Sequence, residues 1–429
     1  MLINFRMKNV FCFNEETILS LEKTKWNELK SKNITEKFDL LKSIVVFWAN
    51  ASGKSRLFKV INRFSIMICE SWNEKLDLNN FFQHFKLEEG KEKKPIELWC
   101  EFIIDDIKYS YEYSIYDQKI VYEKLSYYPK WKITKLFIRK ENKDVVFNER
   151  IFDKQSKLVK DTSWFRENTL FLSAVANADG EISKKIQNFF LENCNVLDGV
   201  SFWRTGFWIN LTAEKMNNDQ VMREKVNNFI KYLDTWISSI EIEEEQREQP
   251  EFIKKEFLSK FNFDKKIYIP KTNHLIYKKN KEVVNKKMTF DLWADESEGT
   301  KQLFALAYPI IDTLEKGKVL FIDEFNTMLH PNISKFLIEL FNSSKYNKKN
   351  AQLIINTHDT NLLNLELFRR DQIYFTEKNK YGESELFSLA DINGIRAEDP
   401  NIEKKYLSGS FGAIPNIEEC DLFTIMNNG

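Results

Sequence analysis

The sequence predicts an α/β protein with an additional antiparallel sheet and a mainly helical insertion. Three observations predict this class. Short apolar runs at Ser43–Phe47, Val319–Ile322 and Leu353–Asn356 alternate with helical patterns, as buried parallel strands do. Alternating aromatic and β-branched residues fill the stretch from Ile96 to Asn148, which is typical of antiparallel strands. From about Gly180 to Glu251 the apolar residues instead recur at helical spacing.

The composition is that of a folded protein with more than one lobe. The chain has 429 residues, 43% of them apolar and 30% charged, and chains of this length usually exceed one hydrophobic core. Its 64 basic and 64 acidic side chains leave no formal net charge, so a nucleic-acid partner would require a local basic patch.

The same sequence excludes several classes of protein. Its five cysteines form no C-x-x-C pair and indicate buried thiols of a reducing compartment, with neither disulfides nor a zinc site. The N-terminus lacks the pattern of a signal peptide, and no apolar stretch reaches the ~18 residues of a membrane helix. We therefore expect a cytoplasmic protein with no membrane partner.

Residues 1–175 are predicted to form the first lobe. Leu2–Phe13 and Glu16–Glu22 have strand patterns joined by a polar turn. The buried strand that follows leads through the sequence WANASGKS into a helix ending near Met67. A charge-rich stretch, Glu70–Lys94, is expected to be a surface excursion before the antiparallel strands.

Residues 176–288 are predicted to be the insertion and residues 289–429 the second lobe. The insertion is expected to be helical up to an acidic run, and then to contain two lysine-rich strands, KKIYIP and HLIYKK. The second lobe returns to regular α/β order. Its predicted elements are a helix from Ser297, the strand Val319–Ile322, a helix after Pro331, the strand Leu353–Asn356, another helix, and a strand Gln372–Glu377.

A phosphate-binding loop is predicted where the first buried strand meets its helix. Backbone N–H groups at a helix N-terminus bind phosphate. Lys54 would contact the β- and γ-phosphates, and the Ser55 hydroxyl would ligate Mg²⁺. The tetrapeptide S-G-K-S is common by chance, so the loop alone does not establish a site. Its candidate nucleotide-binding residues are Asn50, Ala51, Ser52, Gly53, Lys54, Ser55 and Arg56.

Two carboxylates end the strand Val319–Ile322. Asp323 would lie at the C-terminal end of a parallel strand, where α/β sheets bind their ligands, and would hold Mg²⁺ through water. Glu324 would orient and polarise an attacking water molecule. A strand ending in two solvated acids would look the same, so this pair depends on its context.

Two more polar segments could either contact a phosphate or be ordinary ends of a strand and a helix. His358 follows the apolar strand LIIN, where its imidazole could donate to a γ-phosphate or simply be a polar strand end. The segment SEGTK, Ser297–Lys301, precedes an apolar helix. Ser297 would cap this helix, and Gly299 would permit close backbone approach, which makes either a second phosphate site or an ordinary N-cap.

The four motifs, in this order and on these elements, resemble the Walker A, signature, Walker B and H-loop of ABC-type ATPases. Asn326–Pro331 resembles the D-loop. More than half of the chain separates Lys54 from Ser297, which is unlike transporter subunits and similar to RecF-, SMC- and OLD-like heads. The resemblance implies an ABC-type P-loop ATPase head, with the antiparallel sheet in the first lobe and the helical insertion between the lobes.

The sequence is also similar to the bacterial abortive-infection and RloA-like stand-alone ATP-binding proteins. The shared segments lie at both ends of the chain and are MLINFRMKNVFCF, ANASGKS, TLFLS, SEGTK, THDT and YLSGSFGAIP. This resemblance implies ATP and Mg²⁺ as cofactors and a homodimer in which Ser297 and Gly299 complete the partner's site. It also implies antiphage defence through a separately encoded effector, often a TOPRIM-type nuclease. Because few residues follow His358, we expect no fused nuclease domain.

Trp48 departs from the family pattern, because it stands where the phosphate loop has its first glycine. A bulky residue in a glycine-type conformation would cost about 1–3 kcal/mol. Three explanations are open: weakened ATP binding, a degenerate homologue, or a mistranslated codon. Retention of Lys54, Ser55, Asp323, Glu324 and His358 favours an active ATPase.

Two other functions remain as alternatives to an antiphage ATPase. One is a non-hydrolysing scaffold marked by Trp48, and the other is a RecF-like DNA-repair ATPase. The segment Lys254–Lys287 holds eleven lysines and three acids, together with Phe261, Phe263, Tyr268 and Tyr277. It could be a nucleic-acid patch, although a solvated face that balances the acidic run before it is the favoured interpretation.

Overall fold

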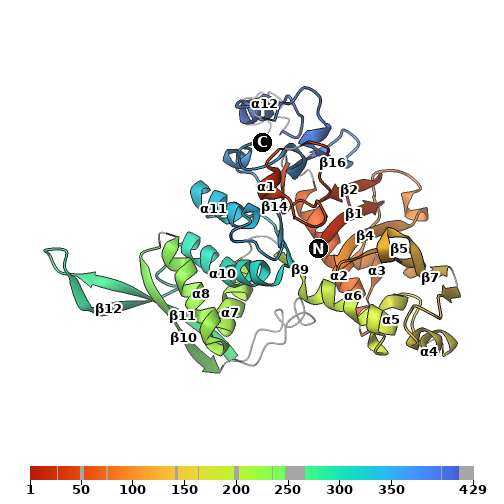
Figure 1. Cartoon of the computed structure of the whole chain (residues 1–429), viewed down its shortest axis with the longest axis horizontal. Helices are drawn as coiled ribbons and strands as arrows, with labels where there is room; N and C mark the ends of the chain where they lie inside the picture. Colours follow the sequence, from red (N-terminus) through yellow and green to blue (C-terminus); the bar gives the residue numbers. More distant parts are fainter. Residues whose placement is uncertain are drawn as a thin grey trace, which may run out of the picture.

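A six-stranded sheet lies at the centre of the molecule, between a seven-stranded antiparallel sheet and a projecting three-stranded arm (Figure 1). The structure is a computed structural model. It describes residues 1–26, 28–48, 53–73, 76–140, 144–162, 164–197, 202–233, 235–246, 266–397 and 399–414. The α/β fold with an added antiparallel sheet is confirmed.

The central sheet is mainly parallel. Its strand order is β16-β15-β3-β14-β13-β9, and only the edge strand β16 runs antiparallel to its neighbour. The sheet takes strands from all three predicted segments of the chain. Their bounds are β3 (Ser43–Trp48), β9 (Cys194–Leu197), β13 (Val319–Ile322), β14 (Gln352–Thr357), β15 (Ile373–Lys378) and β16 (Ser384–Ser388).

Two hydrophobic cores cover the two faces of this sheet. Because successive strand residues point to opposite faces, Ile44 and Val46 belong to one core, and Val45 and Phe47 to the other. Helices α2 and α6 contribute to the first core, and α10 and α11 to the second. This burial on both faces explains why the parallel strands are apolar without interruption. The helices are α2 (Lys54–Glu70), α6 (Glu181–Glu192), α10 (Glu298–Lys316) and α11 (Pro331–Asn342).

The antiparallel sheet packs against α2 and α6 in the first core. Its strand order is β2-β1-β4-β5-β6-β7-β8. The buried Gln352 of β14 connects the antiparallel sheet to the central sheet. The side-chain oxygen of Gln352 accepts from Leu2 N at 2.7 Å, and its side-chain nitrogen donates to Leu2 O at 3.0 Å. The strands are β1 (Leu2–Lys8), β2 (Thr17–Ser20), β4 (Ile96–Ile104), β5 (Ile107–Tyr116), β6 (Lys119–Tyr128), β7 (Thr134–Lys140) and β8 (Asp144–Phe147).

A buried ion pair joins this sheet to helix α5 (Phe171–Asn177). The Glu123 carboxylate accepts the backbone N–H groups of Phe171 and Leu172 at 2.7 and 2.9 Å, and the Tyr111 hydroxyl at 2.9 Å. The guanidinium of Arg139 lies 3.5 Å away and donates to Thr169 O at 2.6 Å. Burial raises the pKa of Glu123 and lowers that of Arg139, because both charges have left water.

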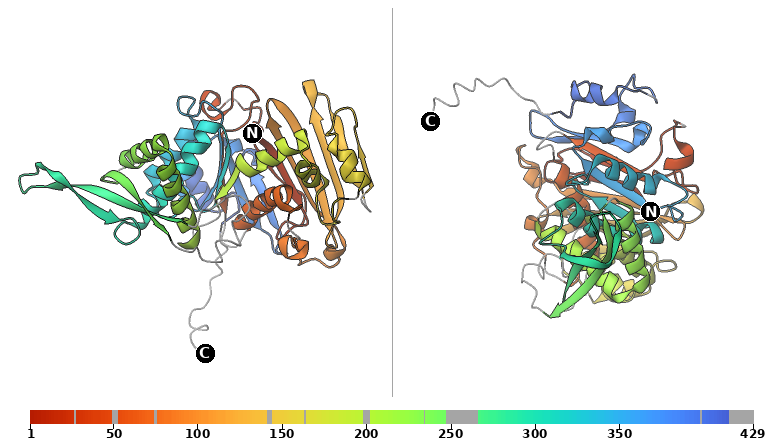
Figure 2. Two further views of the ribbon diagram at one scale, coloured as in Figure 1. Left: turned by 90° about the horizontal axis from the view of Figure 1, so that it is seen from below. Right: turned by 90° about the vertical axis from the view of Figure 1, so that its left-hand side faces the viewer.

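The insertion combines two helices with the arm. Helices α7 (Phe202–Asn218) and α8 (Gln220–Tyr232) pack against α10. The arm projects from the body in Figure 1 and in the left-hand view of Figure 2. Its strands are β10 (Ile237–Gln246), β11 (Lys266–Tyr277) and β12 (Val283–Asp291). The helical prediction up to Glu251 is therefore wrong for β10. Its β-branched isoleucines and its pairing with β11 over its full length favour a strand.

Helix α10 contains Pro309 in its interior. Proline has no N–H to donate to the carbonyl of residue 305. The buried Thr212 of α7 is close to this carbonyl instead, with 3.5 Å between its hydroxyl and Ala305 O. The helix thus continues past a proline because the neighbouring helix supplies a donor.

Two other predictions of secondary structure need correction. The predicted helix after β14 is replaced, among the described residues, by 3-10 turns at Thr360–Leu362 and Arg370–Gln372. Side chains of Asp359 and Asn364 accept backbone N–H groups two residues ahead, at 3.0 and 2.7 Å, and such turns compete with a helix. The first strand ends at Lys8 instead of Phe13, because Asn9 and Phe11 have positive φ.

The remaining predictions concern the surface and the cysteines. The stretch from Glu70 is not wholly a surface excursion, since Leu78, Phe82 and Phe85 are buried. Cys12, Cys69, Cys100 and Cys194 are free thiols, and Cys420 lies outside the described residues. Within the described ranges, no helix is long and apolar enough to cross a membrane. Short helices complete the fold: α1 (Lys30–Asn33), α3 (Leu78–Phe81), α4 (Gln155–Asp161) and α12 (Ile402–Leu407).

Candidate functional site

Three neighbouring parallel strands, β13, β14 and β3, end at the same edge of the central sheet. Ile322 pairs with Ile355, so Asp323 comes level with Asn356. Thr357 pairs with Phe47, so His358 comes level with Trp48. The carboxyl ends of parallel strands are where open α/β sheets bind ligands. The strand register therefore brings the predicted carboxylates and histidine together.

Helix α2 begins at this edge. Its N-cap, Gly53, has a φ of 99°, no side chain caps the helix there, and no acidic residue lies in its first turn. A β-carbon at position 53 would lie 2.5 Å from Cys12 Sγ and 2.7 Å from Ser384 Oγ, so only glycine fits. This 17-residue helix presents the positive end of its dipole to the site. Such an end attracts an anion.

The phosphate loop itself is only partly described. Asn50, Ala51 and Ser52 lie outside the described residues, as does the side chain of Lys54, whose backbone begins α2. Ser55 and Arg56 follow on the exposed first turn of the helix. The role predicted for each of these residues remains a prediction.

Asn356 holds the Asp323 carboxylate and the backbone of Glu324. Its amide group donates to Asp323 Oδ1, and its amide oxygen accepts the backbone N–H of Glu324 at 2.5 Å. Its backbone oxygen accepts Phe325 N at 3.1 Å. Glu324 has a φ of 55°, so the chain turns sharply directly after β13. Asn356 fixes this turn and leaves Asp323 buried, at 7% exposure.

Trp48 contacts His358 directly. The indole Nε1 donates to His358 Nε2 at 3.0 Å, and the two rings meet edge to face with centroids 4.6 Å apart. Trp48 is the last residue of β3, and its backbone is extended. The strain expected for a glycine-type conformation is therefore absent. The backbone does not need glycine here, and the indole, 3% exposed, packs in the first core.

The segment Ser297–Lys301 begins α10 as predicted. Ser297 caps the helix, with its hydroxyl accepting Thr300 N at 3.2 Å, and lies at the surface. A β-carbon on Gly299 would lie 2.8 Å from the backbone oxygen of Met328. Gly299 therefore permits the start of α10 to pack on the segment Asn326–Pro331. This segment is in turn tied to β14, since Thr357 donates to Asn326 at 2.6 Å.

The comparison with protein families identifies part of this arrangement. Residues 219–364 match the family described as "AAA domain, putative AbiEii toxin, Type IV TA system". The matched residues include the start of α10, both carboxylates and His358. The match covers less than half of the chain, and over these residues the sequence is similar to that family.

Two solved structures are similar to this chain over most of their length. One is the SMC head domain from Thermotoga maritima, with 14% identity, a TM-score of 0.42, and coverage of 90% of this chain and 98% of that one. The other is the recombination mediator protein RecF with ATP, with 13% identity, a TM-score of 0.37, and coverage of 90% and 99%. No curated protein matches the chain.

The residues at this sheet edge fit Mg²⁺ and a nucleoside triphosphate. Among the described residues, no cluster of three or more His, Cys, Asp or Glu side chains could hold a metal by itself. Magnesium typically takes only one or two carboxylates and completes its shell with water and phosphate oxygens. Asp323 and the Ser55 hydroxyl are suitable donors, and the uncapped end of α2 suits the phosphates.

Sequence reasoning missed Asn356 and the contact of Gly299 with Met328. In the prediction Asn356 is only the last residue of the apolar strand LIIN, without a role in the site. The available signal was its position one residue beyond the last apolar residue of LIIN, the same position that Asp323 has after VLFI. Two neighbouring parallel strands that end alike put these two side chains opposite each other.

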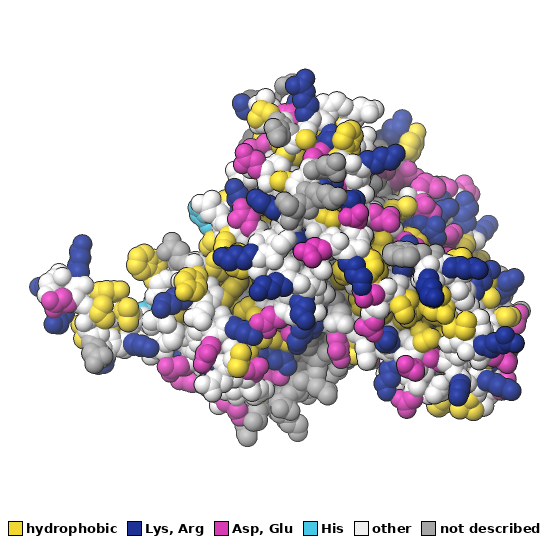
Figure 3. Space-filling model, viewed as in Figure 1, with side chains coloured by type: hydrophobic (Ala, Val, Ile, Leu, Met, Phe, Trp, Pro, Cys, Tyr) yellow, Lys and Arg dark blue, Asp and Glu magenta, His cyan; other side chains and the backbone are white. Residues whose placement is uncertain are grey.

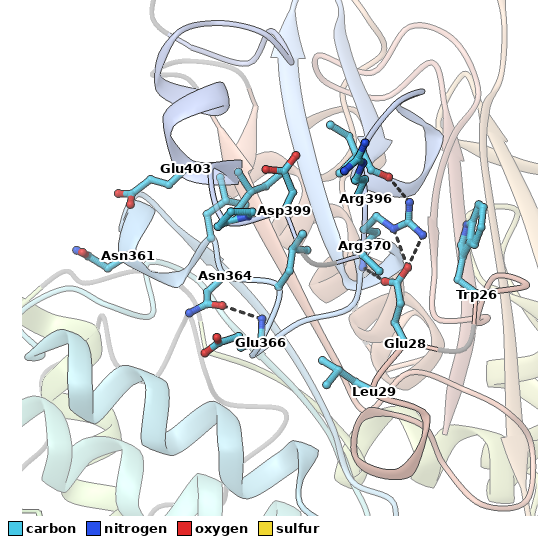
Figure 4. A pocket seen from close by; sticks show the side chains of 16 residues that line it. Trp26, Glu28, Leu29, Asn361, Asn364, Glu366, Arg370, Arg396, Asp399 and Glu403 are labelled. Atoms are coloured by element: carbon cyan, nitrogen blue, oxygen red, sulfur yellow. Dashed lines mark hydrogen bonds and ion pairs between the residues drawn. The ribbon is translucent and has the colours of Figure 1, made fainter.

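A separate cavity of about 1270 Å³ lies beyond His358, between the Thr360–Leu362 turn and α12. Figure 4 shows Glu28 and Arg370 paired on one side of it, below Trp26. Asn361, Asp399 and Glu403 lie on the other side. None of the proposed nucleotide-binding residues lines this cavity, so its size is no argument for the nucleotide site.

Proposed function

We propose that this chain binds ATP with Mg²⁺ and hydrolyses it to ADP and phosphate. One observation carries the proposal: a single sheet edge brings together the open N-terminus of α2, Asp323, Glu324 and His358. An anion-binding helix end beside two carboxylates supplies both requirements of phosphoryl transfer, namely phosphate binding and activation of water.

The proposed roles follow from position. Lys54 and the first N–H groups of α2 would bind the β- and γ-phosphates, with Asn50–Gly53 and Arg56 around them. Ser55 and Asp323 would hold Mg²⁺, which neutralises developing charge on the phosphates when bound. Glu324, placed by the turn that Asn356 fixes, would accept a proton from the attacking water. His358 would donate to the γ-phosphate.

A second copy of the chain would complete each site. Ser297 is exposed at the N-terminus of the 19-residue helix α10, and a helix of this length presents its dipole to an anion. In a homodimer of facing heads, Ser297 and Gly299 of each protomer would contact the γ-phosphate bound by the other. ATP would then lie between two protomers and hold them together.

The biological role that we propose is the ATPase component of a bacterial antiphage, abortive-infection system acting in the cytoplasm. The family that matches residues 219–364 is described as a putative AbiEii toxin of a type IV toxin–antitoxin system, which is consistent with this role. The dimer would control a separately encoded effector of the TOPRIM nuclease class.

A second candidate function is a non-hydrolysing scaffold. The specific observation in its favour is the hydrogen bond from Trp48 to His358, because it occupies one of the two ring nitrogens through which His358 could contact a phosphate. A DNA-repair ATPase is the third candidate, and it depends on whether the arm binds DNA.

Measurement of phosphate release tests hydrolysis. The wild type should turn over Mg·ATP, and both Lys54→Ala and Glu324→Gln should abolish turnover. Glu366→Gln, a change of an exposed glutamate outside the site, is the matched control and should leave the rate unchanged. Equal rates in all four proteins would refute the proposed site. Absence of ATP binding in the wild type, not rescued by Trp48→Gly, would favour the scaffold.

A further inference from the structure

The far end of the arm is a two-stranded ribbon. Strand β10 pairs with β11 only as far as His274, whereas β11 and β12 continue together to the pair of Tyr277 with Val283. We call residues 275–287 the arm tip. It stands clear of the body in Figure 1 and in the left-hand view of Figure 2. Among the described strands no third one covers this ribbon, so it could enter a groove.

The arm tip is strongly basic. It contains five lysines and one acid, Glu282. Lys278 pairs with Glu282 at 3.1 Å, and Lys287 donates to Ser239 at 3.3 Å. No carboxylate among the described residues pairs with the other three, which are all exposed: Lys279, Lys281 and Lys286.

The acidic strand β10 does not neutralise these lysines. Glu241 and Glu245 lie opposite Lys271 and Ile267, in the part of the arm nearer the body. Glu243 approaches Lys271 at 3.6 Å. The favoured interpretation, in which the lysines balance the acidic run, thus fails at the tip, although it holds for Lys271. Residues 254–265 of the predicted patch lie outside the described residues.

Apolar side chains accompany the lysines at the tip. Tyr277 and Val283 form a cross-strand pair and are 53% and 54% exposed, and Leu275 lies on the same face. Figure 3 shows basic and apolar side chains side by side at the end of the arm. Uncompensated lysines beside an exposed aromatic ring are typical of nucleic-acid-binding surfaces.

We propose that the arm tip binds double-stranded DNA of B form. The major groove of B-DNA admits a two-stranded β-ribbon, and lysines on the ribbon would meet the phosphates that flank it. The major groove of an RNA duplex is too narrow and deep for such a ribbon. The dimensions of the tip therefore favour a DNA duplex over an RNA duplex.

The arm also has a direct connection to the start of α10. Glu296, the residue before Ser297, accepts the Thr272 hydroxyl at 2.5 Å and lies 2.8 Å from His274 Nε2. Thr272 and His274 belong to β11, immediately below the tip. DNA that repositions the ribbon would thus move the N-cap of α10. An effect of this movement on the nucleotide rests on the proposed function. The binding of DNA by the arm tip does not.

Fluorescence anisotropy without ATP tests binding. The full-length protein is titrated into a labelled DNA duplex, the corresponding single strand and an RNA duplex of equal length. The tip variant is Lys279→Glu with Lys281→Glu and Lys286→Glu. The control variant makes the same charge change at Lys154, Lys157 and Lys160, which are exposed in and before α4, at the opposite end of the molecule (Figure 1).

The wild type should bind the DNA duplex most tightly. The tip variant should lose at least about tenfold in affinity, and its slope of log K against log salt should fall by about 3, because roughly one counterion is released per lysine–phosphate contact. The control variant should retain most of the wild-type affinity and most of the wild-type salt slope. Equal binding by the tip and control variants would overturn the proposal. So would tighter binding of single strands or of duplex RNA, or no nucleic-acid binding at all, which would make the tip a protein-docking surface.

Hydrogen exchange tests the connection without relying on hydrolysis. In the wild type, saturating DNA duplex should change the exchange rate of backbone amides in residues 297–301. In Glu296→Ala the duplex should bind with unchanged affinity, but this change in exchange should be lost. An unaltered response in Glu296→Ala would show that the arm does not act through Glu296.

Discussion

The side chain of Asn356 joins the Asp323 carboxylate to the backbone of Glu324. It donates to Asp323 and accepts the backbone N–H of Glu324 at 2.5 Å, and it is itself buried. A buried group that orients a metal ligand often affects activity nearly as much as the ligand does. Asn356 would act in this way, as a positioning residue without contact to the substrate.

Replacing Asn356 by alanine should lower turnover by about 10- to 100-fold. The reason is that both the Asp323 carboxylate and the turn at Glu324 lose their partner. Phosphate release measured across a range of Mg²⁺ concentrations should show that more Mg²⁺ is needed. Asn364→Ala removes a comparable asparagine from a turn outside the site and is the control. A rate and Mg²⁺ dependence equal to those of the control would contradict this role.

Trp48 holds His358 in the structure. Because His358 Nε2 accepts the indole N–H, a neutral ring carries its own proton on Nδ1. Only Nδ1 could then donate to a phosphate while this hydrogen bond persists. ATP binding through Nε2 would have to break it.

Trp48→Phe should therefore bind ATP more tightly, by about fivefold, since a typical hydrogen bond contributes roughly 1 kcal/mol. Phenylalanine preserves aromatic packing in the first core and removes only the donor. Isothermal titration measures the affinity. The control is Trp99→Phe, which removes the indole bond to Ser110, 2.8 Å long, in the antiparallel sheet. Weaker binding by Trp48→Phe than by the control would show that the indole supports the site.

Most candidate site residues were predictable because they lie in short local patterns. Asp323 and His358 follow apolar strands directly, and Ser297 precedes an apolar helix. Asn356 was not predictable as a site residue, because its importance depends on which strands are neighbours. The contact of Trp48 with His358 depends on the same register, and no local pattern contains it.

At the scale of elements, helix α5 depends on one buried charge. Glu123 accepts the N–H groups of Phe171 and Leu172, and Arg139 stabilises the carboxylate. Burial nevertheless outweighs these partners and raises the pKa of Glu123 above 4.5. A carboxyl with a raised pKa in the folded state binds more protons than in the unfolded state, so its contribution to stability falls as the pH rises above 4.5.

Glu123→Gln removes this dependence. The free energy of unfolding of the variant should therefore improve relative to the wild type as the pH rises from 4.5 towards neutrality. Urea unfolding at several pH values measures this difference. The control is Glu112→Gln, which changes a partly exposed glutamate in the same sheet. A difference that stays constant with pH, or grows in favour of the wild type, would contradict the raised pKa.

Elements with strong periodicity were predicted well, and those held by tertiary contacts were not. The apolar strands β3, β13 and β14 match their predictions within two residues. Strand β10 was missed because its run of glutamates has little apolar alternation, and its pairing with β11 determines its conformation. The turns after β14 depend on polar side chains, including the ion pair of Arg369 with Asp371 at 2.7 Å, which a helical pattern does not reveal.

At the scale of the whole molecule, the proposed function requires two chains. The monomer has a mass of 51.2 kDa. With Mg·ATP, Glu324→Gln should form a stable dimer, because ATP would persist between the protomers. Adding Ser297→Arg should prevent this, since the bulky side chain would occupy the place of the partner's phosphate. Ser410→Arg, at another exposed serine, is the control. Light scattering that shows a dimer in both double variants would exclude this interface.

The nucleotide that remains bound to the protein tests the central claim most directly. Wild type and Glu324→Gln, each in excess over radiolabelled Mg·ATP, are separated from free nucleotide after one turnover, and the bound label is identified. The site predicts ADP on the wild type and uncleaved ATP on Glu324→Gln. Formation of ADP at the same rate on both proteins would contradict the assignment of Glu324, and binding of label to neither would contradict the nucleotide site itself.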